Sequence, residues 1–141
     1  MLNKVVIDTN VWISALFSPA GIPRKIANYF EAGAFILVCS DELITELVTV
    51  ISRPEITAKL SLEEANELVS LIIERAVFVQ VKDVPAVSPD PKDDIFLASA
   101  ATAVCDFLVT GNRKDLLDLG SHGQTKIVSP RQFLEILQQQ N

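Results

Sequence analysis

The chain has few histidine, cysteine and aromatic residues: one histidine, two cysteines and 6% aromatic residues over 141 positions. A zinc site needs a set of histidine and cysteine ligands at characteristic spacings, and the sequence contains no such set. The single histidine, His122, lies in "GSHGQ", which favours a loop residue over a catalytic base. Cys39 and Cys105 each follow a valine, which favours two buried, inert thiols.

Long apolar runs and an excess of basic charge are also missing. No stretch approaches the roughly 18 apolar residues of a membrane helix, and the first residues do not resemble a signal peptide. We therefore expect no membrane contact and a cytoplasmic location. The net charge of −6 argues against a protein that coats nucleic acid through bulk charge. It does not exclude a nucleic-acid enzyme whose acids hold metal ions, because a bound cation reverses the local sign.

The length and the hydrophobic content of 49% predict one domain, residues 1–141, with an aliphatic core. Short β-branched runs alternate with helical patterns. The predicted strands are 5–7, 35–39, 77–81, 107–110 and 127–128, and the predicted helices begin near Val11, cover 23–31, 41–52, 62–76, 95–104 and 116–119, and begin again at Pro130. Ser61 and Glu64 form a predicted capping box. The alternation predicts an α/β fold in three layers, with a mostly parallel central sheet of about five strands flanked by helices.

Two acids follow predicted strands. Asp8 ends the run "VVID", and Asp115 comes shortly after the strand at 107–110. Ligand sites of parallel sheets lie beyond the carboxyl ends of the strands, so both acids are candidates for a site. Each also has a simpler interpretation, because each could cap the helix that comes next.

Two further acids lie on predicted helices. Glu46 is at the edge of the polar arc of its helix, where exposure to solvent alone would also explain it. Asp94 comes at the start of the helix "IFLASAATAV", where an acid also offsets the helix dipole. Its face contains Leu97, Ala98 and Ala101, so we expect this face to pack closely and to carry Asp94 toward the interior.

The four acids come from four segments, three of which can converge at one edge of the sheet. Several carboxylates in one place cannot all stay ionised without a compensating cation. Mg²⁺ and Mn²⁺ prefer such oxygen ligands. The sequence contains neither the G-x-x-x-x-G-K-[ST] phosphate loop nor the G-x-S-x-G elbow. It therefore predicts a carboxylate–metal site suited to phosphoryl chemistry.

Four segments, in order along the chain, resemble the PIN-domain nucleases, and in particular the bacterial and archaeal toxins of the VapC type. They are "VVIDTNVWISAL" with Asp8, "SDELITELVTVISRP" with Glu46, "PKDDIFLASAATAV" with Asp94 and "DFLVTGNRKDLLDL" with Asp115. The resemblance implies a PIN-like fold and a metal-dependent endoribonuclease whose four acids hold Mg²⁺ or Mn²⁺. It also implies an RNA substrate, a protein antitoxin that blocks the site, and a homodimer.

One position departs from the family that the chain resembles. Many members carry an acid two residues after the threonine of the fourth segment, where this chain has Asn112. The site would then have three or four carboxylates and hold one or two metal ions. Asn10 and Thr110 would orient the acids or the scissile phosphate, as groups behind metal ligands commonly do. Arg113 and Lys114 would contact the RNA backbone, or are simply exposed loop charges.

Other interpretations fit less well or stay open. A receiver-type signalling module needs an acidic pair at the first strand, which here ends in Asp8 alone. A phosphatase of the haloacid dehalogenase class would need an acid in place of Asn10. A PIN-like domain that binds RNA or a protein partner without cutting is a further alternative. Trp12 could stack on a base, although a buried helix tryptophan is the simpler interpretation.

Overall fold

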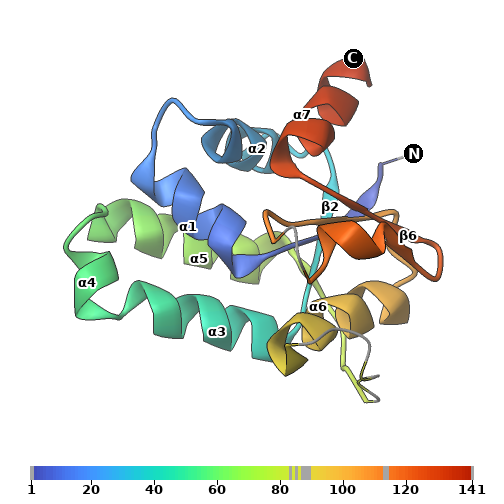
Figure 1. The fold of residues 1–141 in the computed structure, drawn as a ribbon. Coiled ribbons are helices and arrows are strands. Elements are labelled where there is room, and N and C mark those ends of the chain that lie inside the picture. Colours follow the sequence, from blue (N-terminus) through green and yellow to red (C-terminus); the bar gives the residue numbers. More distant parts are fainter. Residues whose placement is uncertain (1, 83, 85, 87–89, 113–114, 141) are drawn as a thin grey trace.

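The computed structural model describes residues 2–82, 84, 86, 90–112 and 115–140. A six-stranded sheet runs through the middle of this part of the chain, in the order β3-β2-β1-β4-β6-β5 (Figure 1). Its strands are β1 (Lys4–Ile7), β2 (Ile36–Cys39), β3 (Val77–Phe78), β4 (Phe107–Val109), β5 (Ser121–His122) and β6 (Thr125–Val128). Within this sheet only β5 is antiparallel to its neighbour. The predicted α/β fold with a mostly parallel sheet is confirmed.

Two strands differ from the prediction. The additional strand, β5, forms a short hairpin with β6, and Gly123 in its turn has a φ of 58°, which residues with a side chain rarely adopt. His122 therefore lies in a strand and not in a loop. At the opposite edge, β3 ends at Phe78, short of the predicted 77–81. Its only neighbour, β2, ends at Cys39, whose carbonyl accepts the last hydrogen bond, from the backbone N–H of Val79.

Helices cover both faces of the sheet. They are α1 (Thr9–Phe17), α2 (Ile22–Glu31), α3 (Asp41–Ile51), α4 (Pro54–Thr57), α5 (Leu62–Arg75), α6 (Pro91–Thr102) and α7 (Pro130–Gln139), with a short 3₁₀ turn, η1, at Leu117–Leu119. In Figure 1, α2 and α7 lie together above the sheet, and α3 and α6 lie below it, which gives the three expected layers. Helix α6 begins earlier than the predicted 95, because Pro91 suits a first helical turn.

Side-chain caps explain where several helices begin. Ser40 Oγ accepts a hydrogen bond from the backbone N–H of Leu43, which confirms the predicted cap of α3. Ser61 caps α5 in the same way, but the reciprocal bond of the predicted capping box is not made. The carboxylate of Glu64 instead pairs with Arg24 at 2.9 Å. The complete capping box is at the start of α7, between Ser129 and Gln132.

The core is aliphatic, with a line of aromatic rings through it. Trp12 is 4% exposed and packs against Phe30 with 5.7 Å between ring centroids, so its buried interpretation is confirmed. Cys39 and Cys105 are free and buried, and burial raises their pKa values to about 11 and about 12. A thiol with so high a pKa is inert at neutral pH. In the part of the chain that the structure describes, none of the helices has the length and apolar character needed to cross a membrane.

Candidate metal centre

Asp8 joins the carboxyl end of β1 to the start of α1. It is the N-cap of α1, because its Oδ1 accepts a hydrogen bond of 3.1 Å from the backbone N–H of Asn10. Its Oδ2 accepts a second bond, of 2.7 Å, from the hydroxyl of Thr110. Asp8 is only 4% exposed, and burial raises the pKa of its carboxyl, although the bonds from Thr110 and Asn10 act in the opposite direction. The capping interpretation of Asp8 is therefore correct, and the acid is also fixed at the sheet edge.

Glu46 reaches the same region from α3. Its Oε2 accepts a hydrogen bond of 3.0 Å from the hydroxyl of Thr9, which is 4% exposed and follows Asp8 directly. Two consecutive residues after β1 therefore build this part of the cluster: Asp8 is itself an acid of the cluster, and Thr9 holds the carboxylate of Glu46. The sequence gives no sign of the contact between Thr9 and Glu46, which lie 37 positions apart.

Asp93, at the start of α6, lies close enough to the other acids for their charges to act on its carboxyl group. The residue is 6% exposed, and the pKa of its carboxyl is raised to about 6. Burial is the largest cause, followed by the negative charges of Asp90, Asp8, Asp115 and Glu46. Three of the four acids selected from the sequence therefore lie within electrostatic reach of one carboxyl group.

The fourth selected acid, Asp94, is also in the interior, at 3% exposure. The prediction that its helix face carries it inward is confirmed, with Leu97 and Ala98 buried, although Ala101 is exposed. Consecutive helical residues point about 100° apart, so Asp93 and Asp94 cannot both point the same way. The sequence reasoning missed Asp93, even though the doubled acid in "PKDD" was the available signal.

Asp115 and Asn112 complete the cluster on the segment after β4. Asp115 is half-buried, and its side chain does not cap η1, whose N-cap is Leu116. Asn112 donates from Nδ2 to Asp93 Oδ2 at 2.9 Å, and its backbone N–H donates to Thr110 Oγ1 at 3.0 Å. Hydrogen bonds therefore connect Asp8, Thr110, Asn112 and Asp93. The predicted RNA contacts, Arg113 and Lys114, lie outside the described residues.

The donor set fits a hard divalent cation. The acids of the cluster carry carboxylate oxygens, with no histidine or cysteine among the clustered side chains, which is the ligand chemistry of Mg²⁺ and Mn²⁺. In residues 2–82, 84, 86, 90–112 and 115–140, no three acidic, histidine or cysteine side chains form a ready metal cage. Mg²⁺ does not need one, because it is commonly held by one or two carboxylates together with waters and a substrate phosphate.

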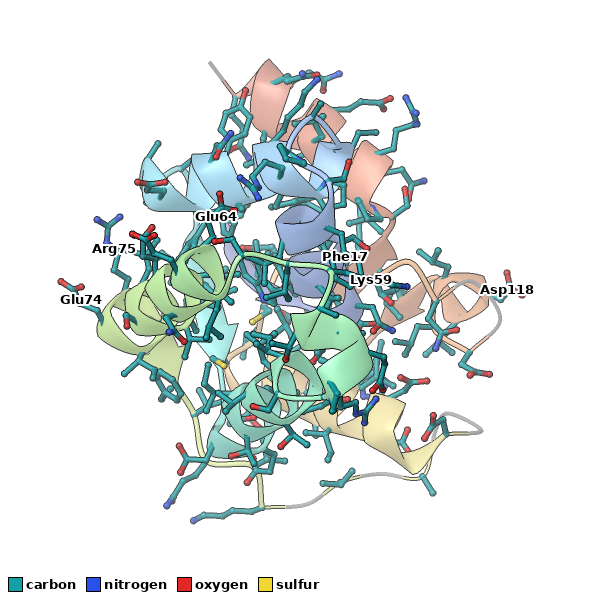
Figure 2. The ribbon with its side chains drawn as sticks, turned by 90° about the vertical axis from the view of Figure 1, so that its left-hand side faces the viewer. Phe17, Lys59, Glu64, Glu74, Arg75 and Asp118 are labelled. Atoms are coloured by element: carbon teal, nitrogen blue, oxygen red, sulfur yellow. The ribbon has the colours of Figure 1, made fainter. Side chains whose placement is uncertain are left out.

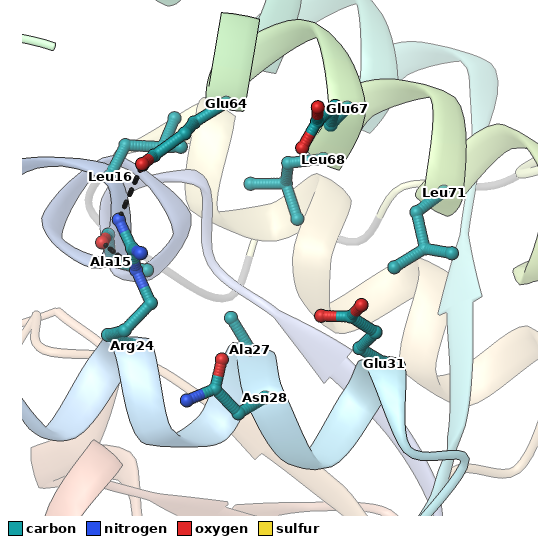
Figure 3. Close-up of a pocket in the computed structure, with 10 residues that line it drawn as sticks. All are labelled: Ala15, Leu16, Arg24, Ala27, Asn28, Glu31, Glu64, Glu67, Leu68 and Leu71. Atoms are coloured by element: carbon teal, nitrogen blue, oxygen red, sulfur yellow. Dashed lines mark hydrogen bonds and ion pairs between the residues drawn. The ribbon is translucent and has the colours of Figure 1, made fainter. Parts of the chain in front are cut away.

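A separate pocket of about 370 Å³ lies between α1, α2 and α5 (Figure 3). Arg24 crosses it, donating to the carbonyl of Ala15 at 2.7 Å and to Glu64 at 2.9 Å. None of the clustered acids lines this pocket. The α5 side of the molecule is shown face on in Figure 2, where Glu74 and Arg75 project outward from the helix end. The pocket is therefore distinct from the candidate metal centre.

The protein is thus an α/β domain with acids gathered beyond the carboxyl ends of β1 and β4. A family model described as "PIN domain" matches residues 4–114, most of the chain. The protein therefore belongs to the PIN domain family, whose members are generally nucleases that use divalent metals. It is also similar to the protein named "Uncharacterized protein MJ1680" of Methanocaldococcus jannaschii, with 28% identity over 141 residues, 94% of this chain and 90% of the relative.

Proposed function

We propose that the protein is a metal-dependent endoribonuclease and the toxin component of a toxin–antitoxin pair. The observation that supports this best is the chain of hydrogen bonds that joins Asp8 to Asp93 through Thr110 and Asn112 at one edge of the sheet. Burial, followed by the charges of neighbouring acids including Asp8, Asp115 and Glu46, raises the pKa of Asp93 there. Such self-repulsion is relieved when a divalent cation binds. The toxin role and the antitoxin that would cover the site rest on the resemblance to VapC-type proteins. The proposed location in the cytoplasm rests on the sequence, in which no signal peptide or membrane helix is recognised.

Asp8, Glu46 and Asp115, with Asp94 or Asp93, would hold Mg²⁺ or Mn²⁺, which lowers the pKa of the attacking water and stabilises the departing 3′ oxygen. The protein's own task is to hold these carboxylates in place. Thr110 fixes Asp8, and Thr9 fixes Glu46, each through one hydroxyl hydrogen bond. Fixed ligands lose less conformational freedom when the cation and the phosphate bind.

We also propose that Asn10, Arg113 and Lys114 contact the RNA. Asn10 is exposed next to Asp8, so its side chain is free to reach a phosphate or a base. Arg113 and Lys114 come directly after Asn112 in the chain, and basic side chains at that position suit the phosphate backbone.

The decisive experiment is a cleavage assay on a pool of RNA transcripts with Mg²⁺, Mn²⁺ or EDTA. The wild type should cleave with either metal and not with EDTA, and Asp8→Asn should abolish cleavage. Asp118→Asn is the matched control, because Asp118 is an exposed acid in η1, outside the cluster (Figure 2). Metal-independent cleavage, or wild-type cleavage by Asp8→Asn, would overturn the proposal.

The same assay separates the two candidates for the third acid. Asp93→Asn and Asp94→Asn should differ in cleavage, since consecutive helical residues point about 100° apart and so meet the metal differently. A wild type that binds the RNA without cutting it under any metal would instead favour a non-catalytic binding domain.

A homodimer is the proposed assembly. Support comes from three large apolar side chains near the end of α5 and on the edge strand β3, namely Ile73, Val77 and Phe78, which are 57%, 49% and 39% exposed. Exposed apolar side chains are common at contacts between subunits. Light scattering at micromolar concentration should give twice the chain mass of 15.4 kDa, and a monomer mass would refute the dimer.

A further inference from the structure

Asn112 is held at both ends of its side-chain amide. Nδ2 donates to Asp93 Oδ2 at 2.9 Å and to Asp115 Oδ2 at 3.5 Å. Oδ1 accepts a hydrogen bond of 3.3 Å from the backbone N–H of Asp115. This pattern fixes the orientation of the amide, because exchanging its ends would place the oxygen against two carboxylates and the NH₂ group against an N–H donor.

The donor end of Asn112 therefore lies between the carboxylates of Asp93 and Asp115. Two acids on either side of one position are the arrangement that a bridging cation would otherwise stabilise. Here a neutral NH₂ group contacts both, and its oxygen is turned away toward the backbone. A metal ion at this position would have to displace the amide and break its hydrogen bonds.

The other side of the cluster is arranged differently. A threonine hydroxyl holds one oxygen of each acid, Thr110 on Oδ2 of Asp8 and Thr9 on Oε2 of Glu46. Oδ1 of Asp8 accepts one further bond, from the backbone N–H of Asn10. A carboxylate has about four lone-pair positions, so each acid keeps free acceptor capacity for a cation. Among the described residues, none donates a hydrogen bond to Oε1 of Glu46.

We propose that Asn112 takes the place of a second metal ion, so that this protein binds a single divalent ion, held by Asp8 and Glu46 together with the oxygen of Asp115 that faces away from Asn112. The inference rests on the proposed metal-dependent function. Asn112 is then a positioning residue: it keeps Asp93 and Asp115 together without joining the metal's ligands. Replacing it by aspartate would remove the donor and add a carboxylate, which creates a second cation position.

Metal stoichiometry tests this directly, without reference to activity. The full chain is dialysed against increasing Mn²⁺, and the bound ion is counted by mass spectrometry of the metal and by the loss of the free Mn²⁺ spin-resonance signal. The wild type should bind one ion and Asn112→Asp two. Asn66→Asp makes the same change at an exposed position of α5, and should bind one.

Asn112→Ala removes the contact to both acids without adding charge. It should still bind one ion, with affinity lowered about tenfold, as is usual when a group that orients metal ligands is lost. Circular dichroism confirms that each variant is folded, and the wild-type count stands even if a variant is not. Two ions on the wild type, or one on folded Asn112→Asp, would overturn this inference and leave the proposed function standing. No bound ion on any variant would overturn both.

Discussion

The hydroxyl of Thr110 donates a hydrogen bond of 2.7 Å to Oδ2 of Asp8, joining residues that lie 102 positions apart in the chain. Thr110 follows β4 and Asp8 follows β1, and these two strands are parallel neighbours in the sheet. Their carboxyl ends are therefore side by side, which brings the two residues within reach. Because both side chains are buried, the bond has little competition from water.

Thr110→Val should destabilise the metal-free protein by about 2 kcal/mol, since it removes a hydrogen bond to a buried acid. Its metal affinity should also fall, by about tenfold, because Asp8 is no longer held. Thr110→Ser keeps the hydroxyl and should lose much less of both. Urea unfolding in EDTA and Mn²⁺ titration provide the two readouts. Equal behaviour of the valine and serine variants would show that the hydroxyl is not important.

Divalent metal should raise the melting temperature of the wild type. A ligand that binds only the folded state, at a concentration about 100-fold above its Kd, stabilises it by about 2.7 kcal/mol. Thermal unfolding with Mn²⁺ and with EDTA measures the shift. Asp8→Asn should lose most of it, while Asp118→Asn should keep it. If Mn²⁺ leaves the wild-type melting temperature unchanged, the cluster does not bind metal.

Without metal, the stability of the protein should fall as the pH rises from about 4 to about 6. The pKa of Asp93 is about 6 in the folded protein and 3.8 for an ordinary aspartate, so in this window the folded state keeps a proton that the unfolded state has lost. Asp8 shifts in the same direction. Urea midpoints in EDTA should show the loss, and Asp93→Asn should reduce its slope. If the urea midpoints of the wild type and of Asp93→Asn differed by the same amount at every pH, the raised pKa of Asp93 would be contradicted.

Val104→Gly should stabilise the protein by about 1 kcal/mol, the usual cost of a left-handed conformation for a residue with a side chain. Val104 has a φ of 52° and is 56% exposed, two residues after the end of α6. The backbone N–H groups of Cys105 and Val104 bond the carbonyls of Ala100 and Ala101, the helix-end motif in which glycine is preferred. Urea unfolding measures the change in the free energy of unfolding.

A matched control separates this local effect from a general effect of glycine. Val48 is also an exposed valine, at 43%, but it lies inside α3. Val48→Gly should destabilise the protein by about 0.5–1 kcal/mol, because glycine in a helix interior loses more conformational freedom on folding. Destabilisation by both variants would show that Val104 is not strained.

Local sequence patterns were sufficient for much of the fold. The β-branched run before Asp8 and the cap at Ser40 act over a few neighbouring residues, and both the strand and the helix lie where these signals predict. The two edge strands of the sheet, β3 and β5, were less predictable. The length of β3 depends on where β2 ends, and β5 exists only because β6 offers it a partner, so neither is encoded in its own few residues.

The candidate site divides in the same way. Asp8 and Asp115 could be selected from the sequence, because an acid after a parallel strand must lie near one edge of the sheet. The sequence could not decide whether Asp93 or Asp94 faces the candidate site, since this depends on how α6 is rotated against its neighbours. The contacts from Thr9 to Glu46 and from Asn112 to Asp93 likewise join separate segments. Only the packing of α3 and α6 beside β1 and β4 brings these side chains within hydrogen-bond distance.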